Sequence, residues 1–167
     1  MTAPRIEALF LQYHASLVRM LYRRTGDRDR AEDLAAEVFA RALEAPPDNP
    51  RPWLFAVALN LVRDDGRRAV RQGRRLQLLK AETAAAQPPP DDDFQRREET
   101  RAVRAALDGL RDIDREVLLL KAEGFDYDEI AATTGLAKGA IGTTLARARR
   151  RLVEAYRAGE KDRHVAS

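Results

Sequence analysis

Apolar side chains recur every three or four residues along most of the chain, and no segment alternates apolar and polar residues as a half-buried strand does. The same periodicity predicts helices over residues 6–24, 27–45, 97–110 and 114–123, and another that starts at Pro52. The clearest stripe lies near the C-terminus and consists of Ile141, Leu145, Ala148, Leu152 and Ala155. We therefore expect an all-α fold.

Residues 110–156 contain three consecutive helical patterns, which are separated by breaks at Gly124 and Gly135. Asp126 or Asp128 is expected to cap the second helix, because a short carboxylate accepts the unpaired amides of a first turn. A short helix, a glycine-containing turn and a longer helix together predict a helix-turn-helix.

The longer helix, which begins near Ala137 or Lys138, carries a small, polar and basic face opposite its apolar stripe. This face contains Gly139, Thr143, Ala146, Arg147 and Arg150. A B-DNA major groove about 12 Å wide accepts a helix with a slim leading end, and arginines further along can then contact phosphate. The alternative is a helical hairpin whose basic face is only solvated.

Residues 77–93 interrupt the helical periodicity with a proline run and three consecutive aspartates, which is typical of a linker. We predict two small helical domains, at residues 1–76 and 97–160, joined by a flexible linker at residues 77–96. The polar tail after Gly159 is expected to fray. Such a linker permits packed or separated domains, so the sequence leaves their relative orientation open.

The helix that follows Pro52 becomes basic along one face, through Arg63, Arg67, Arg71 and Arg74. Arginines at this spacing can follow a phosphate backbone. The net charge is only +3, from 30 basic and 27 acidic residues, so the clustering rather than the balance indicates nucleic acid. An ordinary solvated face is the alternative.

Little in the chain suggests catalysis or metal binding. It contains no cysteine, and its two histidines are far apart, so neither a disulfide nor a zinc site is expected. Nucleotide-binding and hydrolase motifs are also absent. We predict no catalytic residue, no cofactor and no metal. Without a signal peptide or an apolar run of about 20 residues, a cytoplasmic protein without membrane insertion is expected.

Three segments, in this order, resemble the extracytoplasmic-function (ECF) group of bacterial sigma factors, the minimal members of the sigma-70 family. They are GDRDRAEDLAAEVFARAL (26–43), NPRPWLFAVALNLVRDDGRR (49–68) and LRDIDREVLLLKAEGFDYDEIAATTGLAKGAIGTTLARARRRL (110–152). In that family the segments bind the polymerase clamp coiled coil, melt and read the minus-ten promoter element, and read the minus-thirty-five element. The resemblance covers about residues 6–156.

The resemblance implies a factor that directs core RNA polymerase to specific promoters and initiates transcription. Polymerase binding would use Glu32, Asp33, Glu37 and Arg41. Minus-ten DNA would be held by Asn49, Trp53, Asn60, Arg63, Arg67, Arg68 and Arg71. The minus-thirty-five element would be read by Lys138, Gly139, Thr143, Arg147 and Arg150. The implied partners are core RNA polymerase, through its clamp coiled coil and flap, promoter DNA, and an anti-sigma factor that covers these faces.

The chain departs from the family pattern in its recognition helix, where Gly142 and Thr144 stand at common lysine and arginine positions. Ala36 and Leu59 likewise replace a common glutamine and arginine. Weaker or unusual upstream binding is the resulting hypothesis.

Two further interpretations remain. A LuxR-type DNA-binding transcriptional regulator shares the DREVLLL…EIA pattern, although the N-terminal half lacks the strands of a receiver domain. A sigma-like decoy would bind an anti-sigma factor and not promoters.

Overall fold

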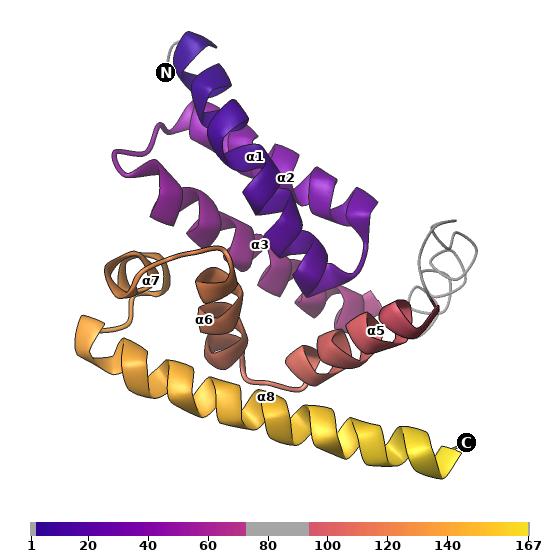
Figure 1. The fold of residues 1–167 in the computed structure, drawn as a ribbon. Helices are drawn as coiled ribbons and strands as arrows, with labels where there is room; N and C mark the ends of the chain where they lie inside the picture. Colours follow the sequence, from indigo (N-terminus) through magenta and orange to yellow (C-terminus); the bar gives the residue numbers. More distant parts are fainter. Residues whose placement is uncertain (1–2, 73–93, 167) are drawn as a thin grey trace.

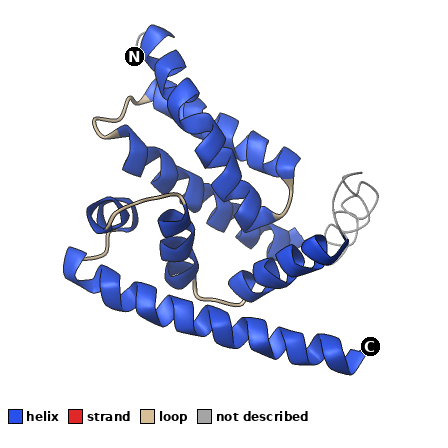
Figure 2. Cartoon of the chain, in the orientation of Figure 1, coloured by secondary structure: helices blue, strands red, loops and turns tan. Residues whose placement is uncertain are grey.

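The computed structural model describes residues 3–72 and 94–166. Figures 1 and 2 show that the secondary structure of this part of the chain is helical, which confirms the all-α prediction. The helices are α1 (Ala3–Thr25), α2 (Arg28–Glu44), α3 (Pro50–Gln72), α5 (Phe94–Asp108), α6 (Asp112–Ala122), α7 (Tyr127–Thr134) and α8 (Lys138–Ala166). Most of the predicted linker, residues 77–93, lies outside the described residues.

The first module, residues 3–72, consists of α1, α2 and α3. Gly26 adopts a φ of 73° and reverses the chain after α1, and the side chain of Asp27 then accepts the amide hydrogen of Arg30 as the N-cap of α2. The predicted stripe of α2 is buried, as the periodicity required. Its members, Ala31, Leu34, Ala35, Val38 and Ala42, belong to a core shared with α1 and α3.

The second module, residues 94–166, contains the predicted helix-turn-helix. Gly124 and Gly135 have φ angles of 83° and 80°, a left-handed conformation that favours glycine. Asp126, not Asp128, caps α7, and it forms a reciprocal capping box with Glu129. In α6, Leu119 is buried, whereas Leu118 is only partly buried.

Two helices extend further than the sequence pattern suggested. α5 begins at Phe94, within the segment predicted as linker, rather than at Arg97. α8 continues to Ala166 instead of fraying after Gly159, and the Arg163 guanidinium lies 5.5 Å from the ring centroid of Tyr156. Figure 1 shows α8 as a long rod along one side of the molecule, beneath α6 and α5, and it contacts both.

The two modules pack against each other, which settles the orientation that the sequence left open. α1 contacts α5 and α6, and α3 contacts α7. Phe55 of α3 and Phe125, just before α7, are both fully buried and meet edge to face with ring centroids 4.8 Å apart. Buried side chains of both modules therefore form one hydrophobic cluster.

Candidate nucleic-acid interface

The outer side of α2 carries an exposed acidic face. Because its apolar stripe is buried against α1 and α3, the residues Glu32, Asp33, Glu37 and Arg41 are exposed to solvent. Arg41 lies 3.2 Å from Glu37, and Arg28 lies 3.6 Å from Glu32. We call Glu32, Asp33 and Glu37 the acidic face of α2; its three carboxylates lie on one exposed side of the helix.

The start of α3 combines an aromatic side chain with polar groups. Asn49 and Asn60 are exposed, while Trp53 is half-buried and packs against the core of the first module. Further along, Arg63 is half-buried and forms a hydrogen-bonded ion pair with Glu116 of α6. The backbone of α3 reaches Gln72, so it includes Arg67, Arg68 and Arg71, whose side chains lie outside what the structure describes.

The leading part of α8 presents the face expected to enter a major groove. Ile141, Leu145 and Ala148 are fully buried, and the opposite face is exposed, with Lys138, Gly139, Thr143, Ala146 and Arg150. Thr144 is buried, and its hydroxyl donates to the carbonyl of Ala140 at 2.7 Å. The position of Thr144 therefore does not contribute to this exposed face.

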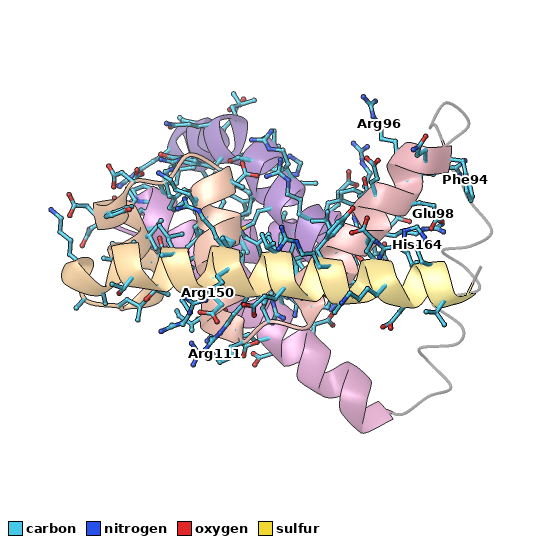
Figure 3. The ribbon with its side chains drawn as sticks, turned by 60° about the horizontal axis from the view of Figure 1, so that its bottom comes forward. Phe94, Arg96, Glu98, Arg111, Arg150 and His164 are labelled. Carbon is cyan, nitrogen blue, oxygen red and sulfur yellow. The ribbon has the colours of Figure 1, made fainter. Side chains whose placement is uncertain are left out.

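Three arginines surround one buried carboxylate beneath the recognition helix. Asp114 of α6 is fully buried and accepts hydrogen bonds from Arg151 at 2.6 Å, from Arg147 at 3.2 Å and from Arg111 at 3.2 Å. Burial opposes the ionisation of Asp114, but these hydrogen bonds outweigh it and hold the pKa of the carboxyl below its usual range. Arg147 is thus half-buried against α6, whereas Arg150 is exposed (Figure 3).

Arg115 and Glu116, which follow Asp114 in α6, have separate structural roles that the sequence did not reveal. The buried guanidinium of Arg115 donates to the carbonyls of Leu107, Asp108 and Leu110 at 3.3–3.5 Å, so it caps the end of α5. Glu116 reaches in another direction, to Arg63 of the first module. In the sequence, three charged residues stand directly before an apolar run. A solvated helix face produces the same pattern, so the pattern did not reveal these contacts.

The two described stretches carry neither a metal-binding cluster nor a membrane-spanning helix. They contain no group of three or more histidine, cysteine or acidic residues that could hold a metal ion. None of their helices is both long and apolar enough to span a bilayer.

Two family models match the two modules separately: "Sigma-70 region 2" matches residues 9–72, and "Sigma-70, region 4" matches residues 100–152. The exposed face of α2, the start of α3 and the helix-turn-helix therefore lie on modules of the sigma-70 type.

Individual proteins with similar sequences are also sigma factors. The ECF RNA polymerase sigma factor EcfG of Rhodopseudomonas palustris (strain TIE-1) is 37% identical over 139 residues, which cover 77% of this chain and 72% of EcfG. RNA polymerase sigma factor YlaC of Bacillus subtilis (strain 168) is 30% identical, over 86% of this chain and 87% of YlaC. The chain belongs to the ECF RNA polymerase sigma factors.

Solved structures share the arrangement of helices. CnrH in complex with the cytosolic domain of CnrY matches with a TM-score of 0.67 and 25% identity, over 94% of this chain and 90% of CnrH. The sigma factor RpoE in complex with the anti-sigma factor NepR, from Bartonella quintana, matches with a TM-score of 0.63 and 22% identity. That match covers 90% of this chain and 96% of RpoE, and it concerns the fold.

Proposed function

We propose that this sigma factor initiates transcription through three separate surfaces on its two modules. Residues 1–76 act as region 2 and residues 97–160 as region 4, with residues 77–96 between them. The protein recruits core RNA polymerase to promoters as an initiation factor without catalytic residues or a cofactor of its own, and it works in the cytoplasm beside the polymerase. The observation that carries this proposal is that the acidic face of α2 and the reading face of α8 are both exposed.

The acidic face of α2, together with Arg41, docks on the clamp coiled coil of the polymerase, while the second module meets the flap. Its carboxylates are held on a helix whose other side is fully packed, so little conformational entropy is lost on binding. The start of α3 holds the minus-ten strand. Asn49, Trp53 and Asn60 supply polar and stacking contacts, and Arg63, Arg67, Arg68 and Arg71 contact phosphate.

The recognition helix α8 enters the minus-thirty-five major groove. Lys138, Gly139 and Thr143 lie at its slim leading end, and Arg147 and Arg150 lie one to two turns further on. The leading turn contains few basic groups. The glycines at 139 and 142 also cost helix stability, so we expect upstream binding to be weak.

An anti-sigma factor is the third partner in this proposal. Of the related folds, RpoE was solved with the anti-sigma factor NepR, and CnrH was solved with the cytosolic domain of CnrY. A partner of this kind would cover the acidic face of α2 or the DNA-binding faces.

The decisive experiment is charge reversal of the acidic face of α2. D33K/E37K should lose co-purification with core polymerase and lose run-off transcription. The matched control is E154K/E160K, which reverses two exposed carboxylates on α8 and should retain both activities. Equal polymerase binding by the two variants would overturn the docking assignment. A wild-type protein that binds core polymerase but yields no transcript would favour the sigma-like decoy, and autonomous promoter binding without polymerase would favour a LuxR-type regulator.

A further inference from the structure

Three partly exposed arginines of the second module converge on one buried carboxylate at the side of α8. The Asp114 side chain is 0% exposed, whereas the side chains of Arg111, Arg147 and Arg151 are 56%, 35% and 39% exposed. Each arginine therefore reaches water while it donates to Asp114. We call Arg111, Arg147 and Arg151 the arginine cluster.

The arginine cluster carries more positive charge than its buried partner balances. Three guanidiniums around one carboxylate leave a local net charge of +2. The nearby carboxylate of Asp112 binds Arg115 instead, at 2.6 Å. Nε of Arg147 is buried and has no hydrogen-bond partner. A cluster of this kind attracts an anion, and arginine side chains bind phosphate through paired hydrogen bonds.

The cluster lies on one flank of the reading face of α8. At about 100° per residue, Arg147 and Arg151 stand about 60° and 100° around the helix from the exposed Arg150. Figure 3 shows Arg111 beside α8 at the level of Arg150. A helix about 10–12 Å across nearly fills a major groove about 12 Å wide. The flanks of α8 would therefore meet the phosphates that line the groove.

Arg111 comes from the turn before α6, where it is the N-cap residue, and not from the recognition helix. Its Nε and Nη2 donate to the two carboxylate oxygens of Asp114 at 3.2 Å and 3.4 Å. Asp114 thereby holds a cation from outside α8 next to two cations of α8. Such preorganisation lowers the entropy lost when the side chains close on a ligand.

We propose that the arginine cluster binds one backbone phosphate of the minus-thirty-five duplex, and that Asp114 is the positioning residue that holds the three guanidiniums together. The inference rests on the proposed entry of α8 into the major groove. It adds Arg111 and Arg151 to the residues that contact DNA, and it gives Arg147 a phosphate as its target. Asp114 itself does not touch the DNA.

The first test uses the holoenzyme, formed from the full chain and core polymerase, and a fluorescent promoter duplex taken from a mapped transcript start. R111A should bind this duplex about tenfold more weakly, because a charge-assisted contact to phosphate is lost. The slope of log affinity against log NaCl concentration should become shallower by about 1. R101A is the matched control, since it removes an exposed arginine of the same module, on α5, and should change neither quantity.

Neutral methylphosphonate groups locate the contact on the DNA. They replace one phosphate at a time across the minus-thirty-five element, and one position should weaken binding of the wild type about tenfold. R111A should be nearly insensitive at that position, because both changes remove the same contact and such changes are not additive.

D114N separates positioning from charge. It makes the protein more positive by one charge, so Coulomb attraction alone would strengthen binding to any duplex. If Asp114 positions the cluster, the methylphosphonate effect at the identified phosphate should shrink from about tenfold to about twofold. Circular dichroism confirms that the variant is folded at the assay temperature. A purely structural role of Asp114 would leave the methylphosphonate effect at full size.

Equal duplex affinities of R111A and R101A would overturn the inference, as would a methylphosphonate effect that R111A retains in full. If R111A binds the duplex normally but yields less transcript, the cluster serves an acidic protein surface, and the phosphate assignment is wrong. Run-off transcription by the wild type separates these outcomes from a failure of the proposed function. A normal transcript with equal affinities refutes only the phosphate contact, whereas no transcript and no duplex binding refute the proposed function as well.

Discussion

The buried carboxylate of Asp114 should be a main source of stability in the helix-turn-helix. We consider D114N, which preserves the shape of the side chain and removes its charge. Removal of one partner from a fully buried ion pair costs about 3–5 kcal/mol, whereas exposed pairs contribute less than about 1 kcal/mol. Asp114 is fully buried, but Arg147 and Arg151 are 35% and 39% exposed and can turn to water.

D114N should therefore lower the free energy of unfolding by an intermediate amount, about 2 kcal/mol, since the amide keeps one acceptor oxygen. For a chain of this size that loss lowers the midpoint of thermal unfolding by about 4–8 °C. Circular dichroism at the helical minimum measures the midpoint. D128N is the matched control: Asp128 also pairs with a cation of α8, Lys138, but both side chains are more than two-thirds exposed, so its midpoint should hardly move.

The stabilisation by the Asp114 carboxylate should decrease as pH falls. The folded-state pKa of Asp114 is lowered, so the unfolded chain binds more protons near the unperturbed value of about 3.9. The stabilisation is then fully present above about pH 5 and is lost as pH falls through the folded-state pKa. The wild type and D114N should converge in acid. Equal midpoints at neutral pH, or an undiminished difference in acid, would refute this reasoning.

Two other predictions concern packing and backbone. F125A removes a fully buried ring that contacts Phe55 and Arg51, so urea unfolding should show a loss of about 3–5 kcal/mol; a loss below about 1 kcal/mol would mean that the modules do not depend on this contact. The substitutions G142A and G135A should have opposite effects on the melting temperature. G142A stabilises α8 by about 1 kcal/mol, because its Cβ would meet only Tyr127 at an ordinary 3.6 Å. G135A destabilises by about 1–2 kcal/mol, because a φ of 80° is left-handed, and a shift of the same sign in both variants would contradict this assignment.

Features of the fold that depend on local chemistry were predictable from the sequence. The stripe Ile141, Leu145 and Ala148 is buried because helical periodicity alone sets which side faces the core. Gly124 and Gly135 mark the turns because few other residues adopt a positive φ. The sequence pattern could not distinguish Asp126 from Asp128 as the N-cap of α7, because the two are only two residues apart and the pattern does not fix the first residue of the helix.

Features that depend on contacts between distant residues were not predictable. Nothing in the local pattern distinguishes Glu116 from a solvated acid, because its partner Arg63 is remote in sequence and lies on the other module. Arg147 was expected on the reading face, but it is half-buried and its Nη2 donates to Asp114 on α6. The DNA-binding roles of these residues remain predictions.

The low net charge of +3 takes on a different meaning once the modules are seen together. The charges are not mixed at the contact between the modules: its arginines belong to one module and its carboxylates to the other. Glu116 and Glu123 would be costly to bury without those arginines, so the closed arrangement depends on both sides at once. Separation of the modules would return Glu116 and Glu123 to water together with their arginines, so it would leave no unpaired charge buried.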